Sequence, residues 1–261
     1  MSRPTARKDS RRRYSKSAVR FVLGFERLSS QLGISHLLYA LSGFPFWLLL
    51  KVLVDWRNDI RIEGKENFPE DEGCFLLCNH TSVGEAPMLA AHFFPWRAMW
   101  FPAKAEFYKN WLAGIGFMII TACHAFPVRR GERDVAAIRL IETLLKKGDN
   151  VLLFPEGTRS KDGSLGKGKK GVGMIIHNAR PKVVPVYATG FEKIIPPDRP
   201  RLLSGKRATI IFGEAIDLED YYDQDLSSPV AQGIVDRVMD AIAGLKQEHE
   251  QRELDQNTVS E

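Results

Sequence analysis

The feature that most constrains the fold is an alternation of short apolar runs with amphipathic segments, which begins near residue 57. The short runs predict buried strands, and the longer segments between them have helical spacing. The predicted strands cover residues 59–64, 74–79, 98–103, 124–128, 151–156, 182–188 and 207–213. The predicted helices cover residues 84–93, 107–115, 132–147, 169–179 and 229–248. This alternation predicts an α/β domain with a mixed, largely parallel sheet flanked by helices.

The rest of the chain divides around this domain, which we place at residues 57–250. Residues 1–16 are basic and polar and predict a disordered tail, and residues 251–261 form a second, polar tail. Residues 17–56 carry two apolar helical patterns. We interpret them as an N-terminal helical hairpin that associates with a membrane.

Residues 34–54 are almost continuously apolar and raise the question of a membrane span. About 20 apolar residues can cross a bilayer, yet Gly43 and Pro45 interrupt this stretch and Lys51 lies near its end. Basic flanks stay cytoplasmic, so a single span would place the domain outside, where its thiols would oxidise. We therefore expect a monotopic anchor on the cytoplasmic face of a membrane, with a single span and a buried hairpin as alternatives.

Charge and cysteine content argue against two classes of function. The net charge is +5, but residues 1–20 contribute +7, which leaves −2 for the remainder and argues against nucleic-acid binding. Cys74, Cys78 and Cys123 cannot all pair with one another, and no second Cys/His pair stands at metal-ligand spacing. We expect reduced, buried thiols in a cytosolic setting.

A histidine and a carboxylate follow the predicted strand that ends at Asn79. His80 comes directly after this residue, and Glu85 follows five positions later at the predicted start of a helix. A carboxylate that accepts a hydrogen bond from one imidazole nitrogen makes the other nitrogen a general base for a substrate hydroxyl. The alternative is that His80 caps the helix and Glu85 is a solvated acid in its first turn.

A second polar motif, FPEGTRSKDG (residues 154–163), follows another predicted strand. Gly157 permits backbone geometry that other residues resist, and Thr158 and Arg159 offer donors suited to a phosphate. Glu156 lies within a turn of Arg159 and is expected to fix the loop. The alternative, a solvated turn, fits poorly with a segment that leaves a buried strand.

Basic residues also follow two further strands. Arg129 and Arg130 come directly after the strand in FPVRRGERD (residues 126–134), and Lys104 lies just past the strand at 98–103. A guanidinium can bind a phosphate through two hydrogen bonds. A flexible basic turn and a solvated lysine are the respective alternatives.

Together these motifs resemble those of the glycerolipid acyltransferases, and in particular the lysophosphatidic acid acyltransferase type. The resemblance covers about residues 58–215, and the segments that carry it are HTSVGE (80–85), AFPVRRG (125–131), FPEGTRS (154–160) and VVPVYATG (183–190). Two departures stand out: Glu85 replaces the usual Asp of the first motif, and Val128 and Arg129 replace the usual Ile-Asp of the second.

The resemblance implies transfer of a fatty acyl group from acyl-coenzyme A or acyl-carrier protein to the free hydroxyl of lysophosphatidic acid, which gives phosphatidic acid, without a metal or other cofactor. His80 would act as the general base, and Glu85 would orient it. The residues that would hold the acceptor phosphate or shape its loop are Lys104, Arg129, Arg130, Glu156, Gly157, Thr158 and Arg159. Alternative acceptors are glycerol-3-phosphate and other lyso-lipids. A non-catalytic, lipid-binding protein at the membrane surface is the alternative of another class.

Overall fold

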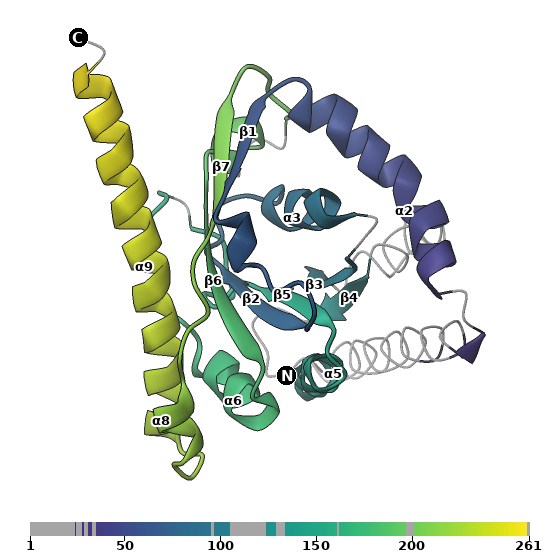
Figure 1. The fold of residues 1–261 in the computed structure, drawn as a ribbon, viewed down its shortest axis with the longest axis vertical. Coiled ribbons are helices and arrows are strands. Elements are labelled where there is room, and N and C mark those ends of the chain that lie inside the picture. The colour runs from purple at the N-terminus through teal and green to yellow at the C-terminus, as the bar shows by residue number, and fades with distance from the viewer. Residues whose placement is uncertain are drawn as a thin grey trace, which may run out of the picture.

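The computed structural model describes residues 24, 28, 31–32, 35–94, 97–104, 124–128, 134–160, 162–196 and 201–259. Seven strands form one sheet in the order β1-β7-β6-β2-β5-β3-β4 (Figure 1). Only the β6–β7 pair in this sheet is antiparallel, which confirms the predicted mixed, largely parallel sheet. The strands are β1 (Asp59–Glu63), β2 (Cys74–Cys78), β3 (Met99–Lys104), β4 (Ala125–Val128), β5 (Asn150–Leu153), β6 (Lys182–Thr189) and β7 (Arg207–Phe212).

Helices connect and cover these strands in the places that the sequence predicted, with two differences. The last helix begins at Ser228 and continues to Val259, so it includes most of the expected polar tail. Two short helices after β6 and β7 were not predicted. The helices are α2 (Ser35–Leu50), α3 (Glu85–Phe93), α5 (Val135–Lys146), α6 (Lys170–Ala179), α7 (Phe191–Ile194), α8 (Glu219–Tyr222) and α9 (Ser228–Val259), with a π-helical η1 (Lys51–Asp55) and a 3-10 turn η2 (Lys65–Asn67).

Parts of the predicted N-terminal organisation fall outside the described residues. These are the basic tail at 1–16 and nearly all of the first helix of the hairpin, as well as the helix predicted at 107–115. The second helix of the hairpin is present as α2 and η1.

The two faces of the sheet bury separate hydrophobic cores, because side chains alternate along each strand. In β2, Phe75 and Leu77 pack on the side of α5, α6 and α9, whereas Leu76 packs on the side of α3 and η1. Figure 1 shows α5, α6 and α9 on one face of the sheet and α2 and α3 on the other. All five residues of β2 are buried, as expected for a central strand covered on both faces.

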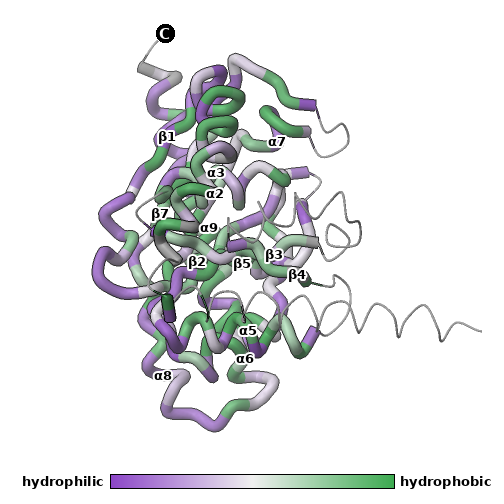
Figure 2. Tube along the Cα trace, turned by 90° about the vertical axis from the view of Figure 1, so that its right-hand side faces the viewer, coloured by the Kyte–Doolittle hydropathy of each residue, from purple (hydrophilic) through white to green (hydrophobic). Residues whose placement is uncertain are grey.

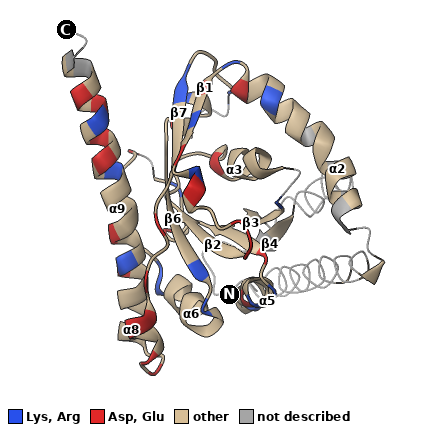
Figure 3. Ribbon diagram, viewed as in Figure 1, with Lys and Arg blue, Asp and Glu red and all other residues tan. Residues whose placement is uncertain are grey.

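Helix α2 is apolar on two opposite sides. One side packs on α3, where Tyr39 and Trp47 contact Phe94 with ring centroids 5.2 and 6.0 Å apart. Figure 2, in which the side of the molecule that carries α2 faces the viewer, shows hydrophobic residues along this helix. Figure 3 shows charged residues only near the C-terminal end of the segment formed by α2 and η1. The large exposed side chains of the outer side, which continues into η1, are Leu37, Leu41, Phe44, Leu48, Leu49 and Val52, which we call the outer stripe.

Among the described residues, no helix has both the length and the apolar character needed to cross a membrane.

Helices α6 and α9 approach each other closely at Gly173. A Cβ atom at this position would lie 1.8 Å from the backbone oxygen of Ala231 in α9, so a side chain would push the helices apart. Gly171, also in α6, has open space where its Cβ would lie. Contact between these helices therefore depends on the absence of a side chain at Gly173.

We expect Gly173→Ala to lower the free energy of unfolding by about 1–3 kcal/mol, because overpacking against backbone cannot be relieved by a rotamer change. Gly171→Ala is the matched control and should leave the stability equal or slightly higher, since alanine favours the helix. Urea unfolding monitored by circular dichroism measures both variants. Equal losses of stability in the two variants would contradict the close-approach argument.

Candidate active site

The site lies where the parallel strands β2, β5 and β6 end, at one edge of the sheet, which is the usual position for ligands in α/β folds. Asn79 follows β2 and exchanges two hydrogen bonds with the backbone of Ala188 in β6. Its Nδ2 donates to the Ala188 oxygen at 2.8 Å, and its Oδ1 accepts from the Ala188 nitrogen at 2.7 Å. This side chain continues the β2–β6 pairing and fixes the position from which His80 leaves the sheet.

His80 and Glu85 are in direct contact. Nδ1 of His80 lies 2.7 Å from Oε2 of Glu85, and the two residues are 4% and 0% exposed. Glu85 is the first residue of α3, slightly later than the predicted helix start. Its side chain folds back over the preceding loop, and this lets the longer acid reach the imidazole.

The other carboxylate oxygen of Glu85 accepts three hydrogen bonds. The donors to Oε1 are the Thr81 nitrogen at 2.6 Å, the Thr81 hydroxyl at 2.6 Å and the Ser82 nitrogen at 2.8 Å. A buried carboxylate is costly unless its oxygens are hydrogen-bonded, and here they are. A carboxylate can only accept hydrogen bonds, and each of these three contacts is donated to it.

This arrangement assigns the tautomer of His80. Because a carboxylate oxygen accepts hydrogen bonds, Nδ1 of His80 donates to Glu85, and in the neutral ring Nε2 is then the free acceptor. Nε2 has no hydrogen-bond partner among the residues that the structure describes. The ring stacks on Phe154 with centroids 3.8 Å apart and 14° between planes, which fixes its orientation. An imidazole held in this way can accept a proton at Nε2.

The FPEGTR loop is fastened to His80 by its backbone and by Glu156. The His80 nitrogen donates to Oε1 of Glu156 at 3.1 Å, and the Ser160 nitrogen donates to the His80 oxygen at 2.7 Å. Oε2 of Glu156 accepts from the Gly166 nitrogen at 2.8 Å. Burial raises the pKa of Glu156, although its two backbone hydrogen bonds oppose this shift. Glu156 thus joins three chain segments, whereas the sequence predicted only that it fixes its own loop.

A basic hollow of about 270 Å³ lies in this loop, and Glu156, which binds the His80 backbone, is one of the residues that line it. Gly157 has φ of +70°, the geometry that the sequence predicted it to permit. Thr158 is exposed and Arg159 is half-buried, and both line the hollow together with Lys167 and Lys169. The hollow thus has three cationic side chains against the carboxylates of Glu156 and Asp162, and this excess of positive charge suits a phosphate group.

The remaining predicted phosphate ligands are only partly placed. The backbone of Lys104 ends β3 at the same sheet edge, since β3 runs parallel to β5, but its side chain is outside the description. Arg129 and Arg130 follow the end of β4 and also lie outside the described residues. Their roles stay predictions.

Sequence reasoning missed four residues that support the base. Asn79, Thr81 and Ser82 supply hydrogen bonds, and Phe154 supplies the stacking surface. A signal was present for three of them, because polar residues directly after a buried strand need partners for their polar groups.

Cys78 lies beside the site but is unsuited to act as a nucleophile. It is fully buried, and burial, followed by the charges of Glu85 and Glu156, raises the pKa of its thiol well above the ordinary value. A thiol that stays protonated is a weak nucleophile. A covalent intermediate on Cys78 is therefore disfavoured.

Comparison with known proteins identifies the family of the chain. The acyltransferase family model matches residues 59–189. The chain is 28% identical over 173 residues to a 1-acyl-sn-glycerol-3-phosphate acyltransferase of Bacillus subtilis, a match that covers 66% of this chain and 81% of that protein. It is 29% identical over 208 residues to a chloroplastic 1-acyl-sn-glycerol-3-phosphate acyltransferase of Brassica napus, covering 75% of this chain and 54% of that protein.

A solved structure is also similar. The crystal structure of the 1-acyl-sn-glycerophosphate acyltransferase from Thermotoga maritima aligns with a TM-score of 0.59 and 26% identity, over 87% of each chain. The family resemblance inferred from the motifs is thereby confirmed. With a family model that matches half of its length, and with these relatives and this fold, the chain belongs to the acyltransferase family.

Proposed function

We propose that this enzyme transfers a fatty acyl group from an acyl thioester to the free hydroxyl of lysophosphatidic acid, which gives phosphatidic acid. The observation that carries the proposal is the His80 imidazole, held at Nδ1 by buried Glu85 and with Nε2 as its acceptor. The printed names of the Bacillus subtilis and Thermotoga maritima relatives support the choice of acceptor.

The proposed reaction needs one proton to move twice. Nε2 of His80 takes the proton of the acceptor hydroxyl as its oxygen attacks the thioester carbonyl. The tetrahedral intermediate then collapses, the carbon–sulfur bond breaks, and the departing thiolate takes the proton back from the imidazolium. Ionised Glu85 stabilises the imidazolium between these steps. These reaction steps require neither a covalent acyl-enzyme nor a cofactor.

The acceptor phosphate would bind in the basic hollow of the FPEGTR loop. Arg159 is half-buried there, and no carboxylate pairs with it among the described residues. Because two hydrogen bonds join this loop to the His80 backbone, one from the Glu156 side chain and one from the Ser160 nitrogen, a phosphate held by Arg159 would keep the acceptor hydroxyl near the base. We further propose, from the sequence, that Lys104, Arg129 and Arg130 extend this phosphate site.

The outer stripe of α2 and η1 supports attachment to a membrane. Its leucines are largely exposed, Leu41 to 65%, although the opposite side of the helix already packs on α3. An exposed apolar surface of this extent is costly in water and suits the acyl region of one leaflet. Attachment would bring the site to its acyl-chain substrates, and we propose the cytoplasmic face of the membrane.

The roles of His80 and Glu85 are tested by His80→Ala, Glu85→Gln and Glu85→Asp, with phosphatidic acid formation measured in lipid vesicles. His80→Ala should lower kcat by about 10²–10⁴-fold, the usual contribution of a general base. Glu85→Gln should come close to this loss, because its amide would donate to Nδ1 and make Nε2 the protonated nitrogen. Glu85→Asp keeps an acceptor-only carboxylate and should retain activity.

Three acceptors serve as controls for the same assay: lysophosphatidic acid, glycerol-3-phosphate and lysophosphatidylcholine. Product from only one of the latter two would keep the chemistry and replace the acceptor. A wild-type protein that acylates none of them would contradict the proposed function. Equal kcat in Glu85→Gln and wild type would contradict the orienting role of Glu85.

The connection made by Glu156 is tested by Glu156→Gln. The variant keeps one acceptor oxygen but turns an amide NH₂ toward the second backbone N–H, which then loses its acceptor at about 1–3 kcal/mol. We expect the free energy of unfolding to fall by this amount and KM for lysophosphatidic acid to rise, while KM for the acyl donor is unchanged. Exposed Glu214→Gln is the control and should match wild type. Unchanged urea unfolding in Glu156→Gln would count against this connection.

Membrane attachment is tested by sedimentation of the protein with vesicles. Leu41→Glu/Leu48→Glu should lower vesicle affinity by about tenfold or more, because burying each leucine is worth about 1.5–3 kcal/mol. Leu254→Glu changes an equally exposed leucine on α9, away from the stripe, and should leave vesicle binding unchanged. Wild-type affinity in the double variant would rule out the outer stripe as the attachment surface.

A further inference from the structure

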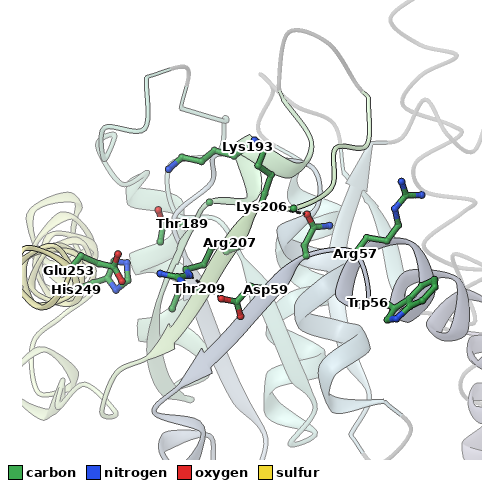
Figure 4. A pocket seen from close by; sticks show the side chains of 14 residues that line it. Trp56, Arg57, Asp59, Thr189, Lys193, Lys206, Arg207, Thr209, His249 and Glu253 are labelled. Atoms are coloured by element: carbon green, nitrogen blue, oxygen red, sulfur yellow. Dashed lines mark hydrogen bonds and ion pairs between the residues drawn. The ribbon is translucent and has the colours of Figure 1, made fainter. Parts of the chain in front are cut away.

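A second hollow opens at the same sheet edge as His80, beyond β6 (Figure 4). Because β7 runs antiparallel to β6 and β1 runs parallel to β7, the first residues of β7 and β1 lie beside the last residues of β6. The hollow has a volume of about 680 Å³, within the range of roughly 300–1,000 Å³ that small-molecule sites occupy. A hollow of this size suits a small-molecule ligand better than a protein partner.

Hydrogen bonds hold the rim of this hollow in place. The Gly205 nitrogen donates to the Arg57 oxygen at 2.8 Å, and the Asp59 nitrogen donates to the Lys206 oxygen at 2.9 Å. The Lys206 nitrogen in turn donates to Oδ1 of Asn58 at 3.0 Å. These bonds join the chain entering β1 to the chain entering β7, so both present their side chains from a fixed frame.

The hollow contains more positive than negative charge. Arg57, Lys193 and Lys206 line it, and no carboxylate pairs with any of them in the described part of the chain. Arg207 lines it too, but its Nε is bound to Asp59 at 3.0 Å. Three unpaired cations around one cavity suit the phosphates of a ligand, because a charged partner replaces the water they lose.

The two ends of the hollow offer other kinds of contact. In Figure 4, His249 and Glu253 reach in from α9 at one end, and Trp56 lies at the other. Trp56 is 83% exposed, so its ring is accessible for stacking. Glu253 would repel a ligand that is only anionic, but it can accept hydrogen bonds from hydroxyl or amino groups. A nucleotide combines phosphates, hydroxyls, an amino group and an aromatic base.

The hollow adjoins the candidate base. The Thr81 hydroxyl lies 3.3 Å from Oε2 of Glu192 in α7, and the next residue, Lys193, lines the hollow. Strands β2 and β1 are three strand spacings apart along the edge, a distance of about 14 Å. The extended pantetheine arm of coenzyme A separates its thioester from its phosphates by a comparable length.

We infer that this hollow binds the nucleotide end of a coenzyme A thioester, so that the acyl donor is an acyl-coenzyme A. Lys193, Lys206 and Arg57 hold its phosphates, and the pantetheine arm runs along the ends of β6 and β2 to His80. The inference rests on the proposed function and names its donor. Acyl-carrier protein presents the same arm without a nucleotide and leaves the hollow without a matching ligand.

Binding and kinetics with the full chain in vesicles test this inference. Calorimetry measures the binding of coenzyme A, dephospho-coenzyme A and pantetheine. The kinetic assay compares palmitoyl-coenzyme A with palmitoyl-acyl-carrier protein as the acyl donor. The variant is Lys193→Ala/Lys206→Ala, and the control is Lys146→Ala/Lys147→Ala, which removes two exposed cations near the end of α5.

We expect wild type to bind coenzyme A more tightly than dephospho-coenzyme A and pantetheine most weakly. The variant should raise the Kd of coenzyme A and KM for palmitoyl-coenzyme A by at least about tenfold, with KM for lysophosphatidic acid unchanged. The control should match wild type.

Three results would overturn the inference and leave the proposed function intact. They are activity with palmitoyl-acyl-carrier protein alone, equal donor KM in variant and control, and a variant that loses affinity only for phosphatidylglycerol vesicles. The last result would identify a lipid headgroup site. A wild type that acylates nothing with either donor would instead contradict the proposed function, and coenzyme A binding would still test the hollow by itself.

Discussion

The site depends on one buried carboxylate. Glu85 has no exposed surface, so its charge requires donors on both oxygens, and the loop that precedes α3 provides them. The same contacts determine the loop's conformation, the start of the helix and the tautomer of His80. The position at the first turn of α3 adds the favourable interaction of an acid with a helix N-terminus. The contacts of Glu85 therefore determine both the orientation of His80 and the conformation of the loop before α3.

Further hydrogen bonds connect His80 to the loop that follows the neighbouring strand β5. The loops after β2 and β5 belong to adjacent parallel strands, so their ends lie about 5 Å apart before any side chain contributes. Glu156 and the backbone of Ser160 use this proximity to fix the FPEGTR loop relative to His80. The sheet thus brings together two motifs that are far apart in the sequence, and hydrogen bonds set their final geometry.

Local patterns predicted the strands and most helices because central strands such as β2 are buried on both faces and helices such as α5 have an apolar side. The contact of His80 with Glu85 was also accessible, since only five positions separate them. The partners of Glu156 were not, because Gly166 and the His80 backbone become neighbours only through strand pairing. The hollow near β1 was missed for the same reason: Arg57, Lys193 and Lys206 come from three distant segments.

Helix α2 packs on α3 by one side and exposes an apolar stripe on the other. Since α3 begins with Glu85, the partner of His80, α3 connects the helix that carries this stripe to the candidate site. On the proposed attachment, the enzyme meets its acceptor by lateral diffusion in two dimensions. Its rate would then follow the mole fraction of lyso-lipid in the leaflet instead of its bulk concentration, and inert lipid added to the vesicles would act as a diluent. A membrane that accumulates lyso-lipid would accelerate its own repair without any allosteric signal.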